Sequence, residues 1–97
     1  MAAALTEAEI SAGLATLNNW TRAGDALVKE FSFDSYLAGV AFATSVGVVA
    51  EGLDHHPDMT IGWRRVTVSF TTHDAGNQLS AKDIAAAAAV DGLGYPR

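Results

Sequence analysis

The amino-acid sequence predicts an α+β fold, a two-layer αββαββα sandwich in which a four-stranded antiparallel sheet carries three helices on one face. Three observations support this prediction: two capping boxes that open helices, a long apolar helical segment between them, and four short stretches typical of strands. The chain has 97 residues, of which 49% are hydrophobic, and it shows no repeat or linker. We therefore expect residues 1–97 to form a single globular domain.

The first and last helices are predicted by the same start signal. Thr6-Glu7-Ala8-Glu9 is a capping box, and the apolar positions after it predict a helix that ends near Asn18-Asn19. Ser80-Ala81-Lys82-Asp83 is a second capping box, whose helix runs through a stretch of alanines and stops near Gly92. Because the cap explains the carboxylate of Asp83, we expect this residue to act mainly on stability.

The strands are recognised from alternation and from turn residues. In one segment Val66, Val68 and Phe70 alternate with polar residues, which is the pattern of a strand with one buried face. A glycine-containing loop joins the first two strands, as in a hairpin. The predicted strands are Trp20–Arg22, Ala26–Phe33, Met59–Ile61 and Arg65–Thr72.

The segment Ser35–Gly52 predicts a helix that is apolar around nearly its whole circumference. Such a helix is buried on all sides, whereas one small sheet covers only one side. We therefore expect a homodimer or homotetramer built through this helix, with Gly39, Ala43 and Gly47 as a stripe of small residues that allows close helix approach. An edge strand that pairs across a two-fold axis is a second route to assembly.

Composition argues against several classes of function. The net charge of −5, with scattered basic residues, argues against nucleic acid as a partner. The chain has no cysteine, hence no disulfide framework and no thiolate metal site. The longest uncharged stretch, Tyr36–Ala50, has 15 residues, fewer than the ~20 that span a bilayer. Because no targeting pattern is seen at the start, we expect a cytoplasmic protein without membrane contact.

All three histidines of the chain, His55, His56 and His73, lie in one short region. Histidine exchanges protons near neutral pH, so the concentration of all copies indicates a proton-transfer site. Pro57 fixes its own φ and biases His56 toward an extended conformation. Neighbouring residues diverge in a regular strand, so a turn before Pro57 is what could bring His55 and His56 to one pocket, with His73 approaching from the other side.

The same residues allow other interpretations. The histidines with Glu51 or Asp54 could bind Zn²⁺, although neighbouring histidines seldom both reach one metal. Trp63 could be a pocket wall, a core aromatic residue or a stacking surface. Glu51 lies in the last turn of an apolar helix, where a carboxylate opposes the helix dipole. This cost suggests a role in orienting a histidine or in binding a ligand.

The spacing of these residues also resembles a family signature. Glu51 is followed after three residues by His55-His56-Pro57, after five more by Trp63, after nine by His73 and after nine by Asp83. This pattern is similar to that of the pterin-4a-carbinolamine dehydratases, and the similarity extends from about Leu14 to Leu93.

The resemblance implies a hydro-lyase, 4a-hydroxytetrahydrobiopterin dehydratase, which removes water from 4a-hydroxytetrahydropterin to give quinonoid dihydropterin during pterin recycling. It implies acid–base catalysis by histidine with no metal and no organic cofactor. The residues that it assigns to catalysis are His55, His56 and His73, and those that it assigns to pterin binding are Glu51, Asp54, Pro57 and Trp63.

An aromatic amino-acid hydroxylase is the implied partner in the pathway. The alternative is a non-catalytic module, because relatives of this fold serve as dimerisation partners of a homeodomain transcription factor or as assembly factors for a carbon-fixing enzyme. The presence of all three histidines favours the enzyme. The chain departs from the family in one loop, where residues 76–79 (Gly-Asn-Gln-Leu) replace a shorter Gly-Leu or Gly-Gly-Leu. This change lies beside the expected site and leaves the substrate preference open.

Overall fold

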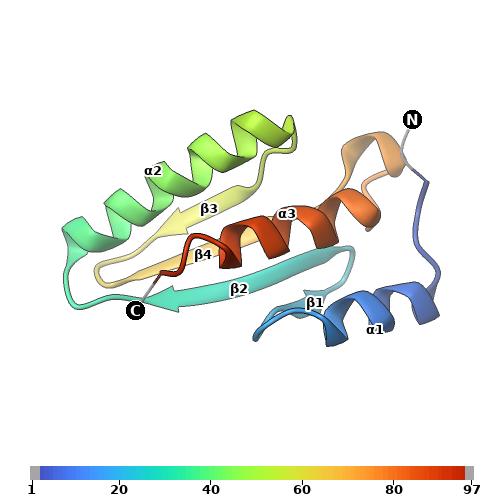
Figure 1. Cartoon of the computed structure of the whole chain (residues 1–97), viewed down its shortest axis with the longest axis horizontal. Helices are drawn as coiled ribbons and strands as arrows, with labels where there is room; N and C mark the ends of the chain where they lie inside the picture. The colour runs from blue at the N-terminus through green and yellow to red at the C-terminus, as the bar shows by residue number, and fades with distance from the viewer. Residues whose placement is uncertain (1–2, 96–97) are drawn as a thin grey trace.

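The computed structural model describes residues 3–95 and has the α+β architecture that the sequence predicts (Figure 1). A single four-stranded antiparallel sheet carries the helices on one face. The elements, in chain order, are α1 (Glu7–Ala15), β1 (Thr21–Ala23), β2 (Ala26–Ser32), α2 (Tyr36–Leu53), β3 (Asp58–Ile61), β4 (Arg65–Phe70), the 3-10 turn η1 (His73–Ala75) and α3 (Ala81–Asp91).

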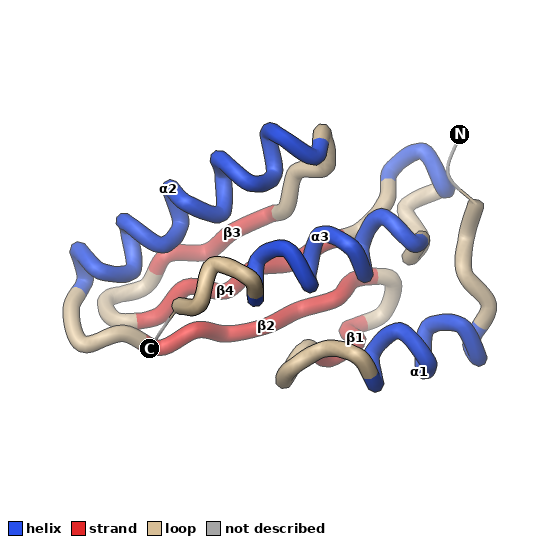
Figure 2. Tube along the Cα trace, in the orientation of Figure 1, coloured by secondary structure: helices blue, strands red, loops and turns tan. Residues whose placement is uncertain are grey.

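The strand order in the sheet is β1-β2-β4-β3, so β2 and β4 are central and β1 and β3 are the edges (Figure 2). The register of β2 against β4 pairs Leu27 with Phe70 at one end and Ser32 with Arg65 at the other. β3 pairs with β4 through a tight hairpin, with Asp58 opposite Ser69. The loops at the Asp58 end of this hairpin carry the histidines.

The core lies between the sheet and the helices, because alternate strand residues point to the helical side. Gly13 of α1 lies against Ile84 of α3, where an added Cβ would be 2.7 Å from the Ile84 Cδ1. The buried apolar residues of the strands are Leu27, Phe31, Val66, Val68 and Phe70, and those of α2 and α3 are Phe42, Ala43, Val46, Ala50, Ala86, Ala87 and Val90.

Both capping boxes that the sequence predicts are present. Thr6 accepts a hydrogen bond from the Glu9 N–H, and Glu9 accepts one from the Thr6 N–H. This backbone donor lowers the pKa of the Glu9 carboxyl. Ser80 and Asp83 form the equivalent pair at the start of α3. Together the two boxes fix where α1 and α3 begin.

Several element ends differ from the prediction by one to three residues. α1 ends at Ala15, before Asn18-Asn19, because the N–H and hydroxyl of Thr16 both bond to the Gly13 carbonyl and cap the helix. β4 ends at Phe70, two residues early, because Thr72 leaves the ladder and pairs with Gln78 in an isolated bridge. His73 consequently begins a 3-10 turn and does not end a strand.

The residues of α2 divide between a face on the sheet and an exposed stripe. Gly39 and Ala43 are buried, and an added Cβ on Gly39 would lie 3.3 Å from the Val66 Cγ2. The predicted small-residue stripe is therefore used inside the chain at these two positions, and only Gly47 faces open space. The exposed stripe, at helical spacings of four, three and four, consists of Leu37, Ala41, Thr44 and Val48.

Within residues 3–95, α2 is the one helix long and apolar enough to cross a membrane, with a mean hydropathy of 1.5. This is weak evidence for a span, since the core helix of a compact domain meets the same criteria. The residues of α2 that face the sheet, such as Phe42 and Val46, are buried in the core of the domain. This burial explains why they are apolar.

Candidate active site

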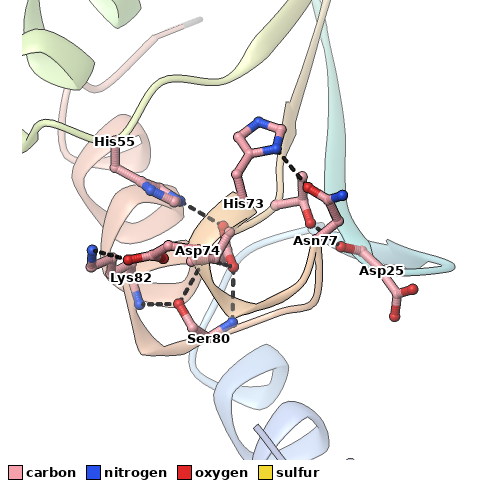
Figure 3. Close-up of polar contacts among 10 residues, drawn as sticks. Asp25, His55, His73, Asp74, Asn77, Ser80 and Lys82 are labelled. Carbon is pink, nitrogen blue, oxygen red and sulfur yellow. Dashed lines mark hydrogen bonds and ion pairs between the residues drawn. The ribbon is translucent and has the colours of Figure 1, made fainter. Parts of the chain in front are cut away.

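The three histidines line one pocket of about 410 Å³, which lies between the turn after α2 and the chain that follows β4. His55 and His56 come from the turn, and His73 comes from the start of η1. Figure 3 shows His55 and His73 on their two segments. The ten residues that line the pocket are Asp54, His55, His56, Pro57, Asp58, Thr71, Thr72, His73, Asp74 and Lys82. Two segments separated by the β3–β4 hairpin thus meet at a single site.

The turn after α2 places the two adjacent histidines. Asp54 ends the helix with φ of 51°, a left-handed conformation that aspartate tolerates better than most residues. The N–H of His55 then reaches back to the Ala50 carbonyl at 3.1 Å. Because this reversal takes place before Pro57, both His55 and His56 remain at the pocket and do not diverge along a strand.

His55 is held by a buried carboxylate. Its Nε2 lies 2.7 Å from the Oδ1 of Asp83, whose side chain has no exposed surface. The ring also stacks on Phe70, with the ring centroids 5.8 Å apart. Since a carboxylate accepts hydrogen bonds, Nε2 carries the proton of this pair and Nδ1 is left as the nitrogen with a free lone pair in the neutral ring.

Asp83 is itself fixed by two further donors. Its Oδ2 accepts hydrogen bonds from the Thr72 hydroxyl at 2.7 Å and from the Ser80 N–H at 2.9 Å. The Thr72 hydroxyl in turn lies 2.6 Å from the Ser80 hydroxyl, which donates because the Thr72 proton is used on Asp83. The helix cap that the sequence predicts is therefore also the support of His55, a second role that the local pattern did not reveal.

His73 is held by the loop of residues 76–79, in which this chain departs from the family signature that it resembles. Its Nδ1 lies 2.7 Å from the Oδ1 of Asn77, which we assign as the acceptor (Figure 3). Asn77 adopts a left-handed conformation with φ of 58° directly after Gly76, which caps η1. The neutral ring then has its free lone pair on Nε2. Both His55 and His73 thus have one nitrogen fixed and one available.

His56 has a different environment. Its Nε2 lies 2.6 Å from the Oε1 of Glu51, and both side chains are mostly exposed. This contact matches the expectation that Glu51 orients a histidine, although Glu51 does not line the pocket itself. An exposed pair of this kind contributes little to stability, so its orientation of the ring is the more important effect.

Of the residues predicted to bind substrate, Asp54 and Pro57 line the pocket and Trp63 does not. Trp63 lies at the tip of the β3–β4 hairpin, where 75% of its surface is exposed and Arg64 stacks over its ring at 5.3 Å. An extended β3 carries this residue away from the turn that holds Pro57.

Sequence reasoning did not identify three further residues of the site. Thr72 supports Asp83, Asn77 holds His73, and Lys82 lines the pocket and forms an ion pair with Asp74 at 3.8 Å. The contacts of Thr72 with Asp83 and of Lys82 with Asp74 join residues from separate elements, so no local spacing indicates them. Asn77 lies only four residues after His73, in the same loop. In the described part of the chain, no group of three or more histidine, cysteine or acidic side chains has the geometry of a metal site.

Comparison with known proteins agrees with this architecture. The chain is 52% identical to a curated protein of Natronomonas pharaonis, provisionally named pterin-4-alpha-carbinolamine dehydratase, over 92% of this chain and 94% of that protein. A crystal structure described as a transcriptional coactivator/pterin dehydratase from Brucella melitensis superposes with a TM-score of 0.86 at 29% identity. The match covers 93% of this chain and 97% of that one.

A second solved structure is a pterin dehydratase-like protein identified as a RuBisCO assembly factor in the alpha-carboxysome. It has a TM-score of 0.67 and 25% identity over 82% of this chain and 94% of that one. The sequence model of the family described as pterin 4 alpha carbinolamine dehydratase matches residues 3–93, nearly the whole chain. The protein therefore belongs to the pterin 4 alpha carbinolamine dehydratase family.

Proposed function

We propose that this protein dehydrates 4a-hydroxytetrahydropterin by histidine acid–base catalysis. The observation that carries the proposal is the convergence of His55, His56 and His73 on one pocket. Two of these rings, His55 and His73, each have one nitrogen bound to a fixed partner. Fixed orientation matters because a proton-transfer group must lie within hydrogen-bond reach of the atom that it serves.

The reaction requires two proton transfers. One group gives a proton to the hydroxyl on C4a, the C4a–O bond breaks, and water leaves. A second group takes the proton from N5, whose electron pair forms the C4a=N5 double bond of the quinonoid product. The acid ends without a proton and the base with one, so a transfer between them or through solvent restores both groups for the next cycle.

His55 and His73 are the candidates for these two roles. They reach the pocket from two segments at the open end of the β3–β4 hairpin, one before β3 and one after β4, so a flat substrate in the pocket could meet both rings. The buried carboxylate of Asp83 offers His55 a charged hydrogen-bond acceptor, whereas Asn77 offers His73 a neutral one. His56 and its Glu51 partner lie at the pocket rim, where they could help to bind the substrate.

A direct assay on chemically generated 4a-hydroxytetrahydropterin tests the function. We expect the purified protein to accelerate dehydration, with the same rate after treatment with EDTA. A rate that disappears in EDTA and returns with Zn²⁺ would replace histidine acid–base chemistry by a metal mechanism. An inactive but folded protein would contradict the enzyme assignment.

The second candidate is a non-catalytic interaction module, which the likeness to the assembly factor supports at the level of the fold. A module of this kind does not need oriented histidines, whereas this chain has three at one pocket. The same assay separates the two candidates, since a module gives no rate above that of the buffer.

We also propose that the protein is a homo-oligomer in the cytoplasm that recycles pterin for an aromatic amino-acid hydroxylase. The assembly is supported by the exposed stripe of α2, in which Leu37 is 73% exposed and Val48 is 69% exposed. Exposed apolar side chains that lie on one face of a helix in this way are typical of protein–protein interfaces.

A further inference from the structure

Lys82 is the one lysine or arginine among the ten described residues that line the histidine pocket. It lies in the first turn of α3, directly before Asp83, the carboxylate that holds His55. The two proton transfers of the proposed reaction give Lys82 no task. A cation that lines the pocket and takes no part in the chemistry is a candidate for binding the substrate.

The ammonium group of Lys82 is only loosely paired. Its Nζ lies 3.8 Å from the Oδ2 of Asp74, a contact that Figure 3 shows. A hydrogen bond between an ammonium and a carboxylate is about 2.7–2.9 Å long, so this contact is an ion pair without a hydrogen bond. Because an ammonium has three donors and the Lys82 side chain is 52% exposed, donors remain for an anionic ligand.

The other basic residues of the described chain are used away from this pocket. Three of them form ion pairs on other elements, and the fourth stacks on an aromatic ring. These contacts are Arg22 with Glu7, Lys29 with Asp91, Arg65 with Glu30, and Arg64 over Trp63. Lys82 is therefore the side chain through which the pocket can recognise negative charge.

The charges that line the pocket come from different segments. Asp54 and Asp58 flank the two adjacent histidines before β3, whereas Lys82 comes from α3. The pyrimidine ring of a pterin presents two donors, the 2-amino group and N3–H, and carboxylates accept such bonds. C6 lies at the opposite corner of the double ring from the 2-amino group. A pterin whose pyrimidine ring meets Asp54 and Asp58 therefore directs its C6 substituent away from them, toward α3.

A second hollow limits the length of that substituent. Lys82 also lines a hollow of about 400 Å³ on the side of α1, together with Glu9. The Thr6 N–H lowers the pKa of the Glu9 carboxyl, so this group is ionised at neutral pH. An anion that passed beyond Lys82 would approach this like charge. The favourable place for an anion is therefore on the histidine side of Lys82, close to C6.

We infer that Lys82 is a specificity-determining residue, which binds a short anionic group such as a carboxylate carried on C6 of the pterin substrate. The sequence leaves the substrate preference open, and this residue sets it. The inference rests on the proposed function, because it takes a pterin as the occupant of the pocket. It also goes beyond that function, since the dehydration itself makes no demand on the charge at C6.

Two stable oxidised pterins test the inference without an assay of activity. Pterin-6-carboxylate and 6-hydroxymethylpterin are similar in size and differ in the charge of the group on C6. Both are fluorescent, so quenching of their fluorescence on addition of protein gives each Kd. We expect the wild type to bind pterin-6-carboxylate roughly twofold to fivefold more tightly than 6-hydroxymethylpterin, the range of one partly exposed ion pair.

Substitutions of Lys82 identify the source of this preference. In Lys82→Gln the preference for pterin-6-carboxylate should be lost or reversed, because the charged side chains left in the pocket lining are those of Asp54, Asp58 and Asp74. Lys82→Arg should keep it, since the positive charge is retained. Circular dichroism checks the fold, which should persist because the Lys82 side chain is half-exposed.

Arg65→Gln is the matched control. It removes the same charge from the chain at the start of β4, outside the pocket lining, where Arg65 pairs with Glu30. We expect this variant to keep the wild-type preference. If it loses the preference to the same extent as Lys82→Gln, the net charge of the chain is responsible and the inference is overturned.

The remaining outcomes separate this inference from the proposed function. If the wild type binds 6-hydroxymethylpterin as tightly as pterin-6-carboxylate, or if Lys82→Gln keeps the preference, Lys82 does not select the substrate, and the dehydratase assignment is untouched. If neither pterin binds, the inference is also overturned, and the dehydration assay decides separately whether the proposed function stands.

Discussion

The Nε2 atom of His55 lies 2.7 Å from the Oδ1 atom of Asp83, a carboxylate that is wholly buried at the N-terminus of α3. The same carboxylate closes the capping box with Ser80. One side chain therefore connects the start of a helix to a ring in the pocket. Under the proposed function, Asp83 therefore acts on both stability and catalysis, and substitutions can separate the two effects.

We predict that Asp83→Asn lowers kcat by about 10²-fold, the range of one positioned proton-transfer group, because the amide cannot accept from all three donors at once. Asp83→Ala should also destabilise the fold by about 1–3 kcal/mol for each buried partner left without a bond, more than a cap alone. Turnover on the carbinolamine and thermal unfolding measure the two effects.

Ser80→Ala is the matched control, because it removes the side-chain cap and keeps the contact between His55 and Asp83. We expect it to cost about 0.5–2 kcal/mol of stability with turnover near that of the wild type. If Asp83→Asn and Ser80→Ala have the same kinetic effect, Asp83 acts only through the helix.

The histidines themselves give the second prediction. His55→Ala and His73→Ala should each lower the rate by at least ~10²-fold, since each removes one acid–base group. His56→Ala should weaken substrate binding, lower the rate, or both. Circular dichroism shows whether the variants are folded. If His55→Ala and His73→Ala are both folded and turn over at the wild-type rate, the proposed histidine catalysis is wrong.

The third prediction concerns the loop of residues 76–79. Asn77→Ala frees the His73 ring from its partner, so kcat should fall by roughly twofold to tenfold, the equivalent of one hydrogen bond. The melting temperature should fall by a small amount, because alanine fits the left-handed conformation at position 77, with its φ of 58°, less well than asparagine does. Gln78→Ala is the control, since Gln78 contacts Thr72 through its backbone carbonyl. An equal effect of the two substitutions would assign the loss to the loop as a whole.

The part of the fold that the sequence predicts is the part with local signals. The capping boxes at Thr6 and Ser80 and the alternation at Val66, Val68 and Phe70 each depend on residues within one turn or one strand. The bend before Pro57 is local as well, which is why the approach of His55 and His56 to one pocket could be expected.

The remaining features depend on contacts between distant segments. His55 and Asp83 are 28 positions apart, and nothing in the local sequence at either residue specifies the other. Motif spacing grouped Trp63 with the pocket residues, whereas the extended geometry of β3 carries it to the far end of the hairpin. The packing of Gly39 against the sheet could not be predicted from the sequence either. A helix that is apolar on all sides does not indicate which side contacts the sheet.

The final prediction concerns the exposed stripe of α2. Val48→Asp places a charge where 69% of the residue is exposed, so the monomer fold should persist while any interface through α2 is lost. Light scattering over a dilution series should show that the mass of the assembly falls by half or more, toward the 10.1 kDa of one chain or a small multiple of it.

Two further variants make this result specific to the stripe. Val46→Asp, at a position with no exposed surface, should unfold the chain, because an unpaired charge would be buried. Ser11→Asp, at an exposed position of α1, should change neither the mass nor the circular dichroism spectrum. If Val48→Asp also leaves the mass unchanged, or if the wild type is already a monomer at micromolar concentration, α2 is not an interface and its exposed apolar stripe needs another explanation.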